Sequence, residues 1–495
     1  MNPKTLLLGL CLLLTLNYCS KENYAESSNT AGFDLTSNSS GFGSPEVWTG
    51  GEGYNDYEEN PWVDVLETPV STFSIDADGA SYSNARRFLR NDKLPPKAAI
   101  RTEELINYLT YNSPENSTHP ISLNGEIATC PWRPGHKLLR IGLRGKDIPE
   151  SLLPPSNFVF LIDVSGSMSS PDKLELLKES FKIFVDYIDE KDYVSIVTYS
   201  GNAGVVLPPT PGSQKVIIKT AINSLGSGGS TAGAQGIITA YDLAQENFIP
   251  GGNNRVIMGT DGDFNVGISS QDELVELIEE KRDLGIFLTI LGVGTGNLQD
   301  GKMEQIANNG NGNYEYIDNL DQAKKVFVYE FNKFYTVAKD VKIQIEFNSH
   351  MIKKYRLIGY ENRLLEEPDF EDDTKDAGEI GSNQTITALY ELEPTGLLSV
   401  LPSVTVDFRY KHPDADDSIP IFLEIMDEFK PFHQSSENMR FATAVTGYGL
   451  LLGESSYSGD LSYEDILNWA QGAMTFDPHG FREEFIELVN IAKNL

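Results

Sequence analysis

Residues 158–167 read FVFLIDVSGS. Its first five residues are apolar, which is typical of a strand buried on both faces in the middle of a parallel sheet. Asp163, Ser165 and Ser167 then follow on the loop at the carboxyl end of that strand. In open α/β sheets, ligands bind at this edge.

These three side chains offer only oxygen atoms, which suit Mg²⁺, Ca²⁺ or Mn²⁺ better than zinc or copper. A second interpretation is that Asp163 and Ser167 cap the helix that we expect to begin near Pro171. The five residues from 163 to 167 do not by themselves decide between a metal site and a helix cap.

Two later segments favour the metal site. Residues 227–231, SGGST, separate two helical patterns and carry Thr231, and the strand-like residues 255–260 end in Asp261. Because the carboxyl ends of parallel strands meet at one edge of a sheet, we expect these oxygen donors to lie close to the loop that follows residue 162.

The three segments together resemble a von Willebrand factor type A (VWA) domain, whose metal-ion-dependent adhesion site uses an Asp-x-Ser-x-Ser run, a distant Thr and a distant Asp. Carried over position by position, the resemblance implies that the ligands of the cation, direct or through water, are Asp163, Ser165, Ser167, Thr231 and Asp261. Of the three hydroxyls and two carboxylates, we expect one carboxylate to act through water, which leaves a divalent cation incompletely neutralised by its direct ligands, and Mg²⁺ seeks six oxygen ligands. We therefore expect Mg²⁺, or Ca²⁺ or Mn²⁺ in its place, with an open position that binds an Asp or Glu carboxylate of a partner protein.

Strand and helix patterns alternate from about residue 155 to 338. This alternation predicts an α/β domain with a doubly wound, mostly parallel sheet. Residues 339–430 alternate apolar and polar side chains instead, which predicts a β-rich segment, and residues 434–495 have a helical pattern. The segment at 60–150 combines strand and helix signals, so we expect an α+β region before the central domain.

Residues 71–82, STFSIDADGASY, and 355–363, YRLIGYENR, resemble the N-terminal and C-terminal regions of YfbK-type bacterial proteins with a VWA domain. The resemblance extends over about residues 61–495. Within the first of these stretches, Asp76 and Asp78 could form a second cation site or a turn, and we expect the turn.

The first 59 residues are typical of an export signal and a tether. Residues 1–19 place one Lys before an apolar core at 6–16, which is too short to span a bilayer. This segment ends in a site that resembles those of bacterial lipoproteins, with Cys19 as the acylated residue; cleavage without lipid and an uncleaved anchor stay open. Residues 20–59 are rich in Ser, Asn, Gly and acidic residues, so we expect a flexible tether. The protein is then expected in the bacterial cell envelope, lipid-anchored in the periplasm or at the outer membrane.

Composition narrows the range of partners. The 495 residues include 72 Asp and Glu against 39 Lys and Arg, for a formal net charge of −33. Nucleic acid and anionic lipid attract basic surfaces, so we expect neither as the main partner, and contact with the membrane only through the anchor. Only Cys130 lies outside the expected signal peptide, so we expect no internal disulfide, and a small buried hydrophobe rather than a nucleophile.

The sequence does not favour an enzyme. Its six histidines are scattered without a His-Glu-x-x-His motif, and no Gly-x-Ser-x-Gly motif surrounds Ser165 or Ser167. We therefore expect a cation-dependent protein-binding module, acting in adhesion or as a scaffold. The alternatives are a structural or assembly protein in which the cation only stabilises loops, and a metal-dependent hydrolase.

Overall fold

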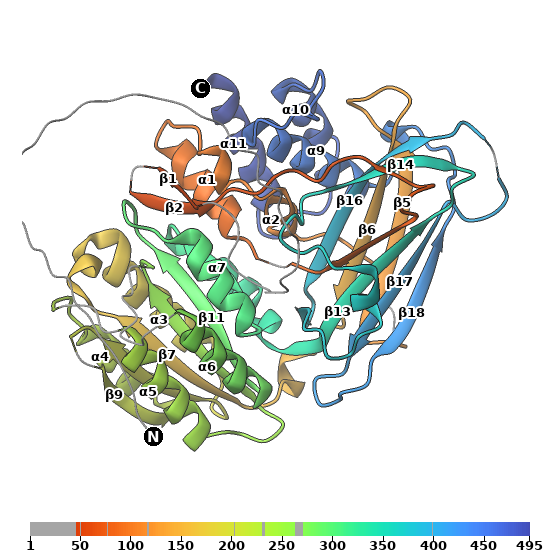
Figure 1. The fold of residues 1–495 in the computed structure, drawn as a ribbon. Helices are drawn as coiled ribbons and strands as arrows, with labels where there is room; N and C mark the ends of the chain where they lie inside the picture. The colour runs from red at the N-terminus through yellow and green to blue at the C-terminus, as the bar shows by residue number, and fades with distance from the viewer. Residues whose placement is uncertain are drawn as a thin grey trace, which may run out of the picture. The chain divides into compact units, whose positions relative to one another are not determined.

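The structure is a computed structural model, and its compact unit runs from Ser44 to Leu495 (Figure 1). It describes residues 46–49, 51–76, 78–115, 118–201, 203–229, 233–262, 271–397 and 399–495. The expected signal peptide, the expected lipidation site at Cys19 and most of the expected tether therefore lie outside the described residues. The end of the expected tether is not flexible, because β1 (Glu46–Thr49) and β2 (Glu52–Asn55) form an antiparallel pair there and Tyr54 is fully buried.

The central domain is built on a six-stranded sheet with the strand order β12-β11-β10-β7-β8-β9. Its strands are β7 (Ser156–Asp163), β8 (Tyr193–Tyr199), β9 (Ala203–Pro211), β10 (Asn253–Thr260), β11 (Ile286–Val293) and β12 (Tyr314–Ile317). All neighbouring strands are parallel except β8 and β9, which are antiparallel. The predicted mostly parallel α/β sheet is therefore confirmed, with the FVFLID strand at its centre.

Every residue of β7 is buried, and its side chains alternate between two cores. Phe158, Phe160 and Ile162 pack with α3, whereas Val159 and Leu161 belong to the core that contains α5. The helices of the domain are α3 (Leu176–Tyr187), α4 (Lys215–Asn223), α5 (Gly233–Glu246), α6 (Gln271–Asp283), α7 (Asp300–Asn309) and α8 (Leu320–Lys324). An apolar stripe of side chains that recur at helical spacing is buried from η4 (Pro171–Glu175) along α3: Leu174, Leu177, Phe181, Phe184, Val185 and Ile188.

Segments before and after the central domain share two antiparallel sheets. One has the order β15-β13-β17-β18, with β4 also paired to β13, and the other has the order β3-β14-β16-β6-β5. The N-terminal strands are β3 (Val63–Asp64), β4 (Val70–Ser74), β5 (Ile121–Thr129) and β6 (Lys137–Gly145). The C-terminal strands are β13 (Thr336–Phe347), β14 (Ile352–Ile358), β15 (Gly378–Gly381), β16 (Thr385–Pro394), β17 (Val404–Lys411) and β18 (Ile419–Ile425). The β-rich region expected at 339–430 is therefore completed by strands from the other end of the chain.

A helical cluster joins the two ends of the chain in the same way. It packs α1 (Ala80–Arg90) and α2 (Thr102–Asn107) against α9 (Glu437–Leu452), α10 (Tyr463–Gln471) and α11 (Phe481–Asn494). The helices expected at 434–495 are thus present, and their core also takes in Cys130. Burial raises the pKa of the Cys130 thiol to about 12, in agreement with a small buried hydrophobe.

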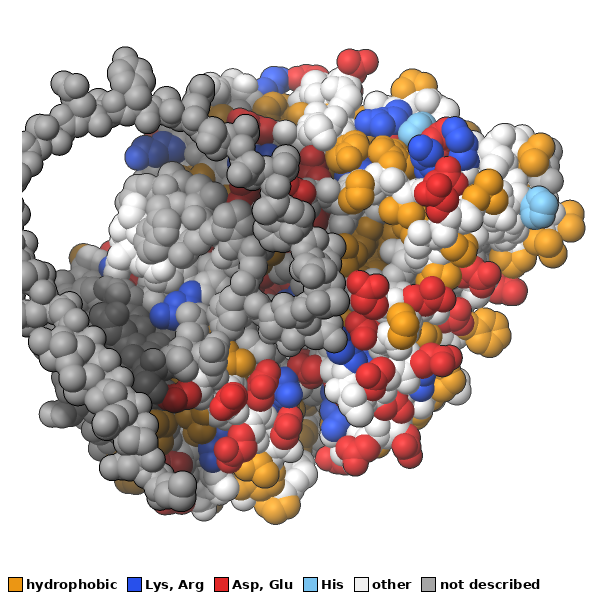
Figure 2. Space-filling model, viewed as in Figure 1, with side chains coloured by type: hydrophobic (Ala, Val, Ile, Leu, Met, Phe, Trp, Pro, Cys, Tyr) orange, Lys and Arg blue, Asp and Glu red, His pale blue; other side chains and the backbone are white. Residues whose placement is uncertain are grey.

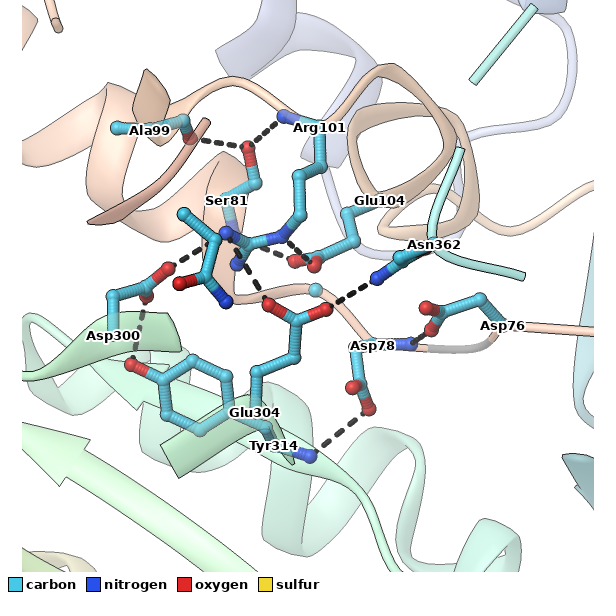
Figure 3. Close-up of polar contacts among 12 residues, drawn as sticks. Asp76, Asp78, Ser81, Ala99, Arg101, Glu104, Asp300, Glu304, Tyr314 and Asn362 are labelled. Carbon is cyan, nitrogen blue, oxygen red and sulfur yellow. Dashed lines mark hydrogen bonds and ion pairs between the residues drawn. The ribbon is translucent and has the colours of Figure 1, made fainter. Parts of the chain in front are cut away.

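The contacts of Asp76 and Asp78 favour the expected turn over a second cation site. The Oδ1 atom of Asp76 accepts a hydrogen bond from the backbone N–H of Asp78 at 2.9 Å, and its Oδ2 atom pairs with Arg363 at 2.7 Å. Asp78 Oδ1 in turn accepts from the backbone N–H of Tyr314 at 2.9 Å (Figure 3). The two carboxylates are therefore used in structural contacts.

The surface reflects the acidic composition. In Figure 2, Asp and Glu side chains are spread over the lower part of the described surface, with some Lys and Arg between them. Among the described residues, no helix combines the length and the apolar character needed to cross a membrane.

Candidate metal centre

Asp163 ends β7 at the carboxyl edge of the central sheet, where it is fully buried. Its Oδ1 atom accepts a hydrogen bond from the backbone N–H of Ser165 at 2.8 Å, so the carboxylate shapes the loop that follows it. Its Oδ2 atom accepts from the hydroxyl of Thr260 at 3.2 Å. The carboxylate therefore contacts two adjacent strand ends.

Ser165 and Ser167 lie on the same loop, with their hydroxyl oxygens 3.0 Å apart. Neither Asp163 nor Ser167 caps a helix. The short helices η3 (Gly166–Ser169) and η4 (Pro171–Glu175) have Ser165 and Ser170 at their N-cap positions, and neither cap uses a side-chain hydrogen bond. The helix-cap interpretation of this loop is therefore not what the structure shows.

Asp261 follows β10, the strand beside β7. The register pairs Ile162 with Gly259, so the residues after these two strands reach the same edge of the sheet. Asp261 is fully buried, like Asp163. The structure thus brings together four of the five residues expected to bind the cation: Asp163, Ser165, Ser167 and Asp261.

Thr231, the fifth expected ligand, lies outside the described residues. The loop just before it does contact the site. The backbone N–H of Gly228 donates to the carbonyl of Val164 at 2.8 Å, and that of Gly166 donates to the carbonyl of Gly229 at 3.2 Å. Gly229 has φ +93°, and a Cβ there would lie 3.0 Å from the hydroxyl of Ser200, so this close approach requires glycine.

Lys173 is a residue of this site that the sequence analysis missed. It lies on η4, is 6% exposed, and its Nζ atom is 3.0 Å from Asp261 Oδ2. Asn297 binds both partners, because its Oδ1 accepts from Lys173 at 2.6 Å and its Nδ2 donates to Asp261 at 2.9 Å. The only sequence signal was a lysine next to Leu174, at the start of a stripe of core residues.

Charge in the site is not balanced among the described groups. Burial raises the pKa of Asp163 to about 6; the hydrogen bonds from Ser165 act in the opposite direction, and the negative charge of Asp261 adds to the increase. Two buried carboxylates face one ammonium group, so the site carries one net negative charge when both acids are ionised. Hydroxyl and carboxylate oxygens are the donors that a hard divalent cation prefers, so the side chains fit such an ion.

The hydroxyls of the loop contact their own neighbours. Ser165 and Ser167 are hydrogen-bonded to each other, and the Ser165 side chain also contacts the carboxylate of Asp163. Among the described residues, the serine–histidine pair that is typical of hydrolytic serine chemistry is not formed at this loop.

A second group of three carboxylates lies elsewhere, with oxygen atoms within 4.8 Å of one another: Asp340, Asp376 and Glu379. Lys411 pairs with Asp340 and Arg282 pairs with Asp376, each at 2.7 Å. Because two of its three acids already have cationic partners, we interpret this group as an ion-pair cluster.

Comparisons with known families agree with this architecture. The family model of the von Willebrand factor type A domain matches residues 157–328. The model described as "Uncharacterized protein YfbK, C-terminal" matches residues 332–402 and 401–495. A further von Willebrand factor model matches residues 49–140.

Individual proteins show how far the similarity extends. The YfbK protein of Escherichia coli K12 is 39% identical over 466 residues, which cover 89% of this chain and 80% of that protein. Human inter-alpha-trypsin inhibitor heavy chain H3 is 28% identical over 175 residues, covering 34% of this chain and 18% of that protein. Among solved structures, a von Willebrand factor type A protein from Catenulispora acidiphila is similar with a TM-score of 0.42, 16% identity, and coverage of 76% of this chain and 91% of that one.

Proposed function

Because this chain belongs to the YfbK family of proteins with a VWA domain, we propose that it binds a partner protein through a divalent cation at the ends of β7 and β10. VWA domains commonly mediate protein interactions. One observation carries the proposal: Asp163 and Asp261 are fully buried at the ends of adjacent parallel strands, with two serine hydroxyls beside them.

The residues that would hold the cation are Asp163, Ser165, Ser167, Thr231 and Asp261. A bound Mg²⁺ supplies positive charge that these groups do not fully neutralise, because Lys173 already offsets Asp261. An Asp or Glu side chain of a partner protein is then the ligand that best completes the site. In this proposal the buried loops orient the oxygen donors, and the partner supplies the remaining charge.

We also propose that the protein acts in the bacterial cell envelope, attached through lipid on Cys19. Support comes from the apolar segment at residues 6–16 and from the composition of residues 20–59. A tether of this kind would let the binding site reach partners away from the membrane surface.

The experiment measures cation binding and partner binding in the same variants. Isothermal titration with MgCl₂ compares the unmodified chain with Asp163→Ala and with Asp242→Ala, an exposed acid on α5 that serves as the matched control. Proteins captured from envelope extracts in MgCl₂ are then challenged with chelator. We expect Asp163→Ala to lose cation binding and capture, and Asp242→Ala to retain both.

The alternative, in which the cation has only a structural role, predicts a different result. If the cation only stabilises loops, Asp163→Ala will lose cation binding and thermal stability but will capture partners as well as the unmodified chain does. Capture that survives both the chelator and the substitution, in a folded variant, would contradict the proposed function.

A further inference from the structure

A cavity of about 230 Å³ lies where several segments distant in the sequence meet. Its walls come from α2 and the residues after it, from β6, from the turn between β15 and β16, and from the loop between α10 and α11, together with the short helices η6 (Lys325–Tyr329) and η7 (Phe331–Phe334). Ligand sites occur preferentially at such junctions between structural units. Its volume is below the roughly 300–1,000 Å³ of clefts for drug-sized ligands, so an occupant would be small.

The cavity has a buried floor and an open rim. Tyr108, Tyr111 and Lys325 are each at most 3% exposed, whereas Tyr329 on the rim is 46% exposed. His479 is also exposed and stacks on Tyr329 with 4.1 Å between the ring centroids. A planar group could therefore enter beside an exposed aromatic pair.

The charged groups of the lining leave one positive charge in excess. Lys325 pairs with Glu330, and Lys333 pairs with both Glu315 and Glu330, so these two cations are offset by two acids. Arg144 is the third cation of the lining. A local positive excess is notable in a chain whose formal net charge is −33.

Arg144 supplies that excess charge. Its guanidinium donates to the backbone carbonyl of Ser113 at 2.8 Å and to Asn383 Oδ1 at 2.9 Å, and both acceptors are neutral. Each of the two terminal nitrogens of the guanidinium carries a second N–H beyond these contacts. A guanidinium with a donor to spare is suited to a carboxylate, because charge-assisted hydrogen bonds are stronger than neutral ones.

We propose that this cavity binds a small organic anion in which a carboxylate is joined to an aromatic ring, with the carboxylate on Arg144 and the ring beside Tyr329 and His479. This site is separate from the candidate metal centre and shares none of its residues. The proposal therefore does not depend on cation binding.

The test uses a matched pair of probes, phenylacetate and phenylacetamide, which share the ring and differ in charge. Binding to the full chain is measured by titration calorimetry at constant salt. We expect phenylacetate to bind about tenfold more tightly than the amide, the effect of one charge-assisted hydrogen bond. Arg144→Gln should abolish the difference between the probes, and Tyr329→Ala should weaken both.

Two controls test whether the effects are specific to this cavity and whether the variants fold. Arg90→Gln changes an arginine that is 45% exposed, lies outside the lining, and should leave both affinities unchanged. Thermal unfolding checks that each variant is folded. We expect Tyr329→Ala to fold normally, because the side chain of Tyr329 is half exposed. Equal affinity for the two probes, no binding of phenylacetate up to about 10 mM, or tighter binding of uncharged N-acetylglucosamine would overturn the proposal.

Discussion

Lys173 gives the candidate metal centre an internal positive charge. Its ammonium group pairs with Asp261 inside the protein, and Asn297 holds both groups in place. Such a pair keeps a buried carboxylate compensated when no cation is bound. It also reduces the attraction of the site for a cation, because a like charge lies beside one of the expected ligands.

Lys173→Met tests this role. We expect Mg²⁺ to bind roughly tenfold more tightly, because the repelling charge is gone. Without a cation, the free energy of unfolding should fall by about 3 kcal/mol, since Asp261 loses its buried partner. Calorimetry with MgCl₂ and urea unfolding in chelator measure the two effects.

The matched control is Lys182→Met, which removes a lysine whose partner Glu179 is 52% exposed. We expect a change of less than about 1 kcal/mol there. An unchanged affinity for Mg²⁺ in Lys173→Met would show that the ammonium group does not influence the cation.

At the scale of elements, the contact between β7 and α3 positions the loop that carries Asp163. Phe160 of β7 stacks on Phe181 of α3 with 4.3 Å between the ring centroids, and Phe184 packs against Phe158 at 4.9 Å. All four rings are fully buried. This tight packing fixes the position of β7, and therefore of Asp163 at its end.

Phe181→Ala should lower the free energy of unfolding by about 3–5 kcal/mol, because it opens a cavity between the strand and the helix. Urea unfolding followed by circular dichroism measures the loss. Val216→Ala on α4 is the control: its side chain is 79% exposed, so we expect a change within about 0.5 kcal/mol. A loss below about 1 kcal/mol for Phe181→Ala would contradict tight packing at this contact.

At the scale of the whole described unit, Arg101 links the N-terminal segment to the central domain. Its guanidinium pairs with Glu104 of α2 and, at 2.6 Å, with Asp300 of α7 (Figure 3). All three side chains are at most 3% exposed. The short loop before α7 also contains Asn297, which contacts Asp261.

Arg101→Met should cost about 3–5 kcal/mol in the free energy of unfolding, because it leaves three buried carboxylates, those of Glu104, Asp300 and Glu304, without this cationic partner. Lys324→Met is the control, since its partner Asp321 is 83% exposed. Chemical unfolding of both variants at neutral pH measures the two losses in the free energy of unfolding. Equal, small losses would mean that the buried pair contributes no more than a surface one.

The shared sheets predict that residues 339–495 do not fold alone. Without the N-terminal segment, β13 loses β4 as a partner and β16 loses β6, which exposes strand edges and apolar side chains. The isolated fragment should show no cooperative thermal unfolding, whereas residues 44–495 should unfold cooperatively. A sharp transition in the fragment alone would contradict the shared core.

Local patterns in the sequence were enough to predict several features that the structure confirms. Five apolar residues followed by Asp163 indicated a central parallel strand with that carboxylate at its end. The burial of Cys130 and the preference for a turn over a cation site at Asp76 followed from equally local reasoning. These predictions succeed because burial periodicity and turn chemistry act over a few neighbouring residues. The expected boundaries at 60–150, 155–338 and 339–495 divide the sequence but do not separate independent sheets, because strands from the outer two segments share sheets.

The sequence alone indicated a buried strand at 158–162 followed by the oxygen donors Asp163, Ser165 and Ser167, and a second strand-like segment at 255–260 followed by Asp261. Three features are visible only in the tertiary structure. Lys173 pairs with Asp261, β6 pairs with β16, and Arg144 lines a cavity whose other charged side chains balance one another. This is because the hydrophobic periodicity of the sequence indicates whether a side chain is buried but not which side chains it contacts. Partners that are 88 or more residues apart in the sequence, as in these pairs, are selected by the packing of the whole chain.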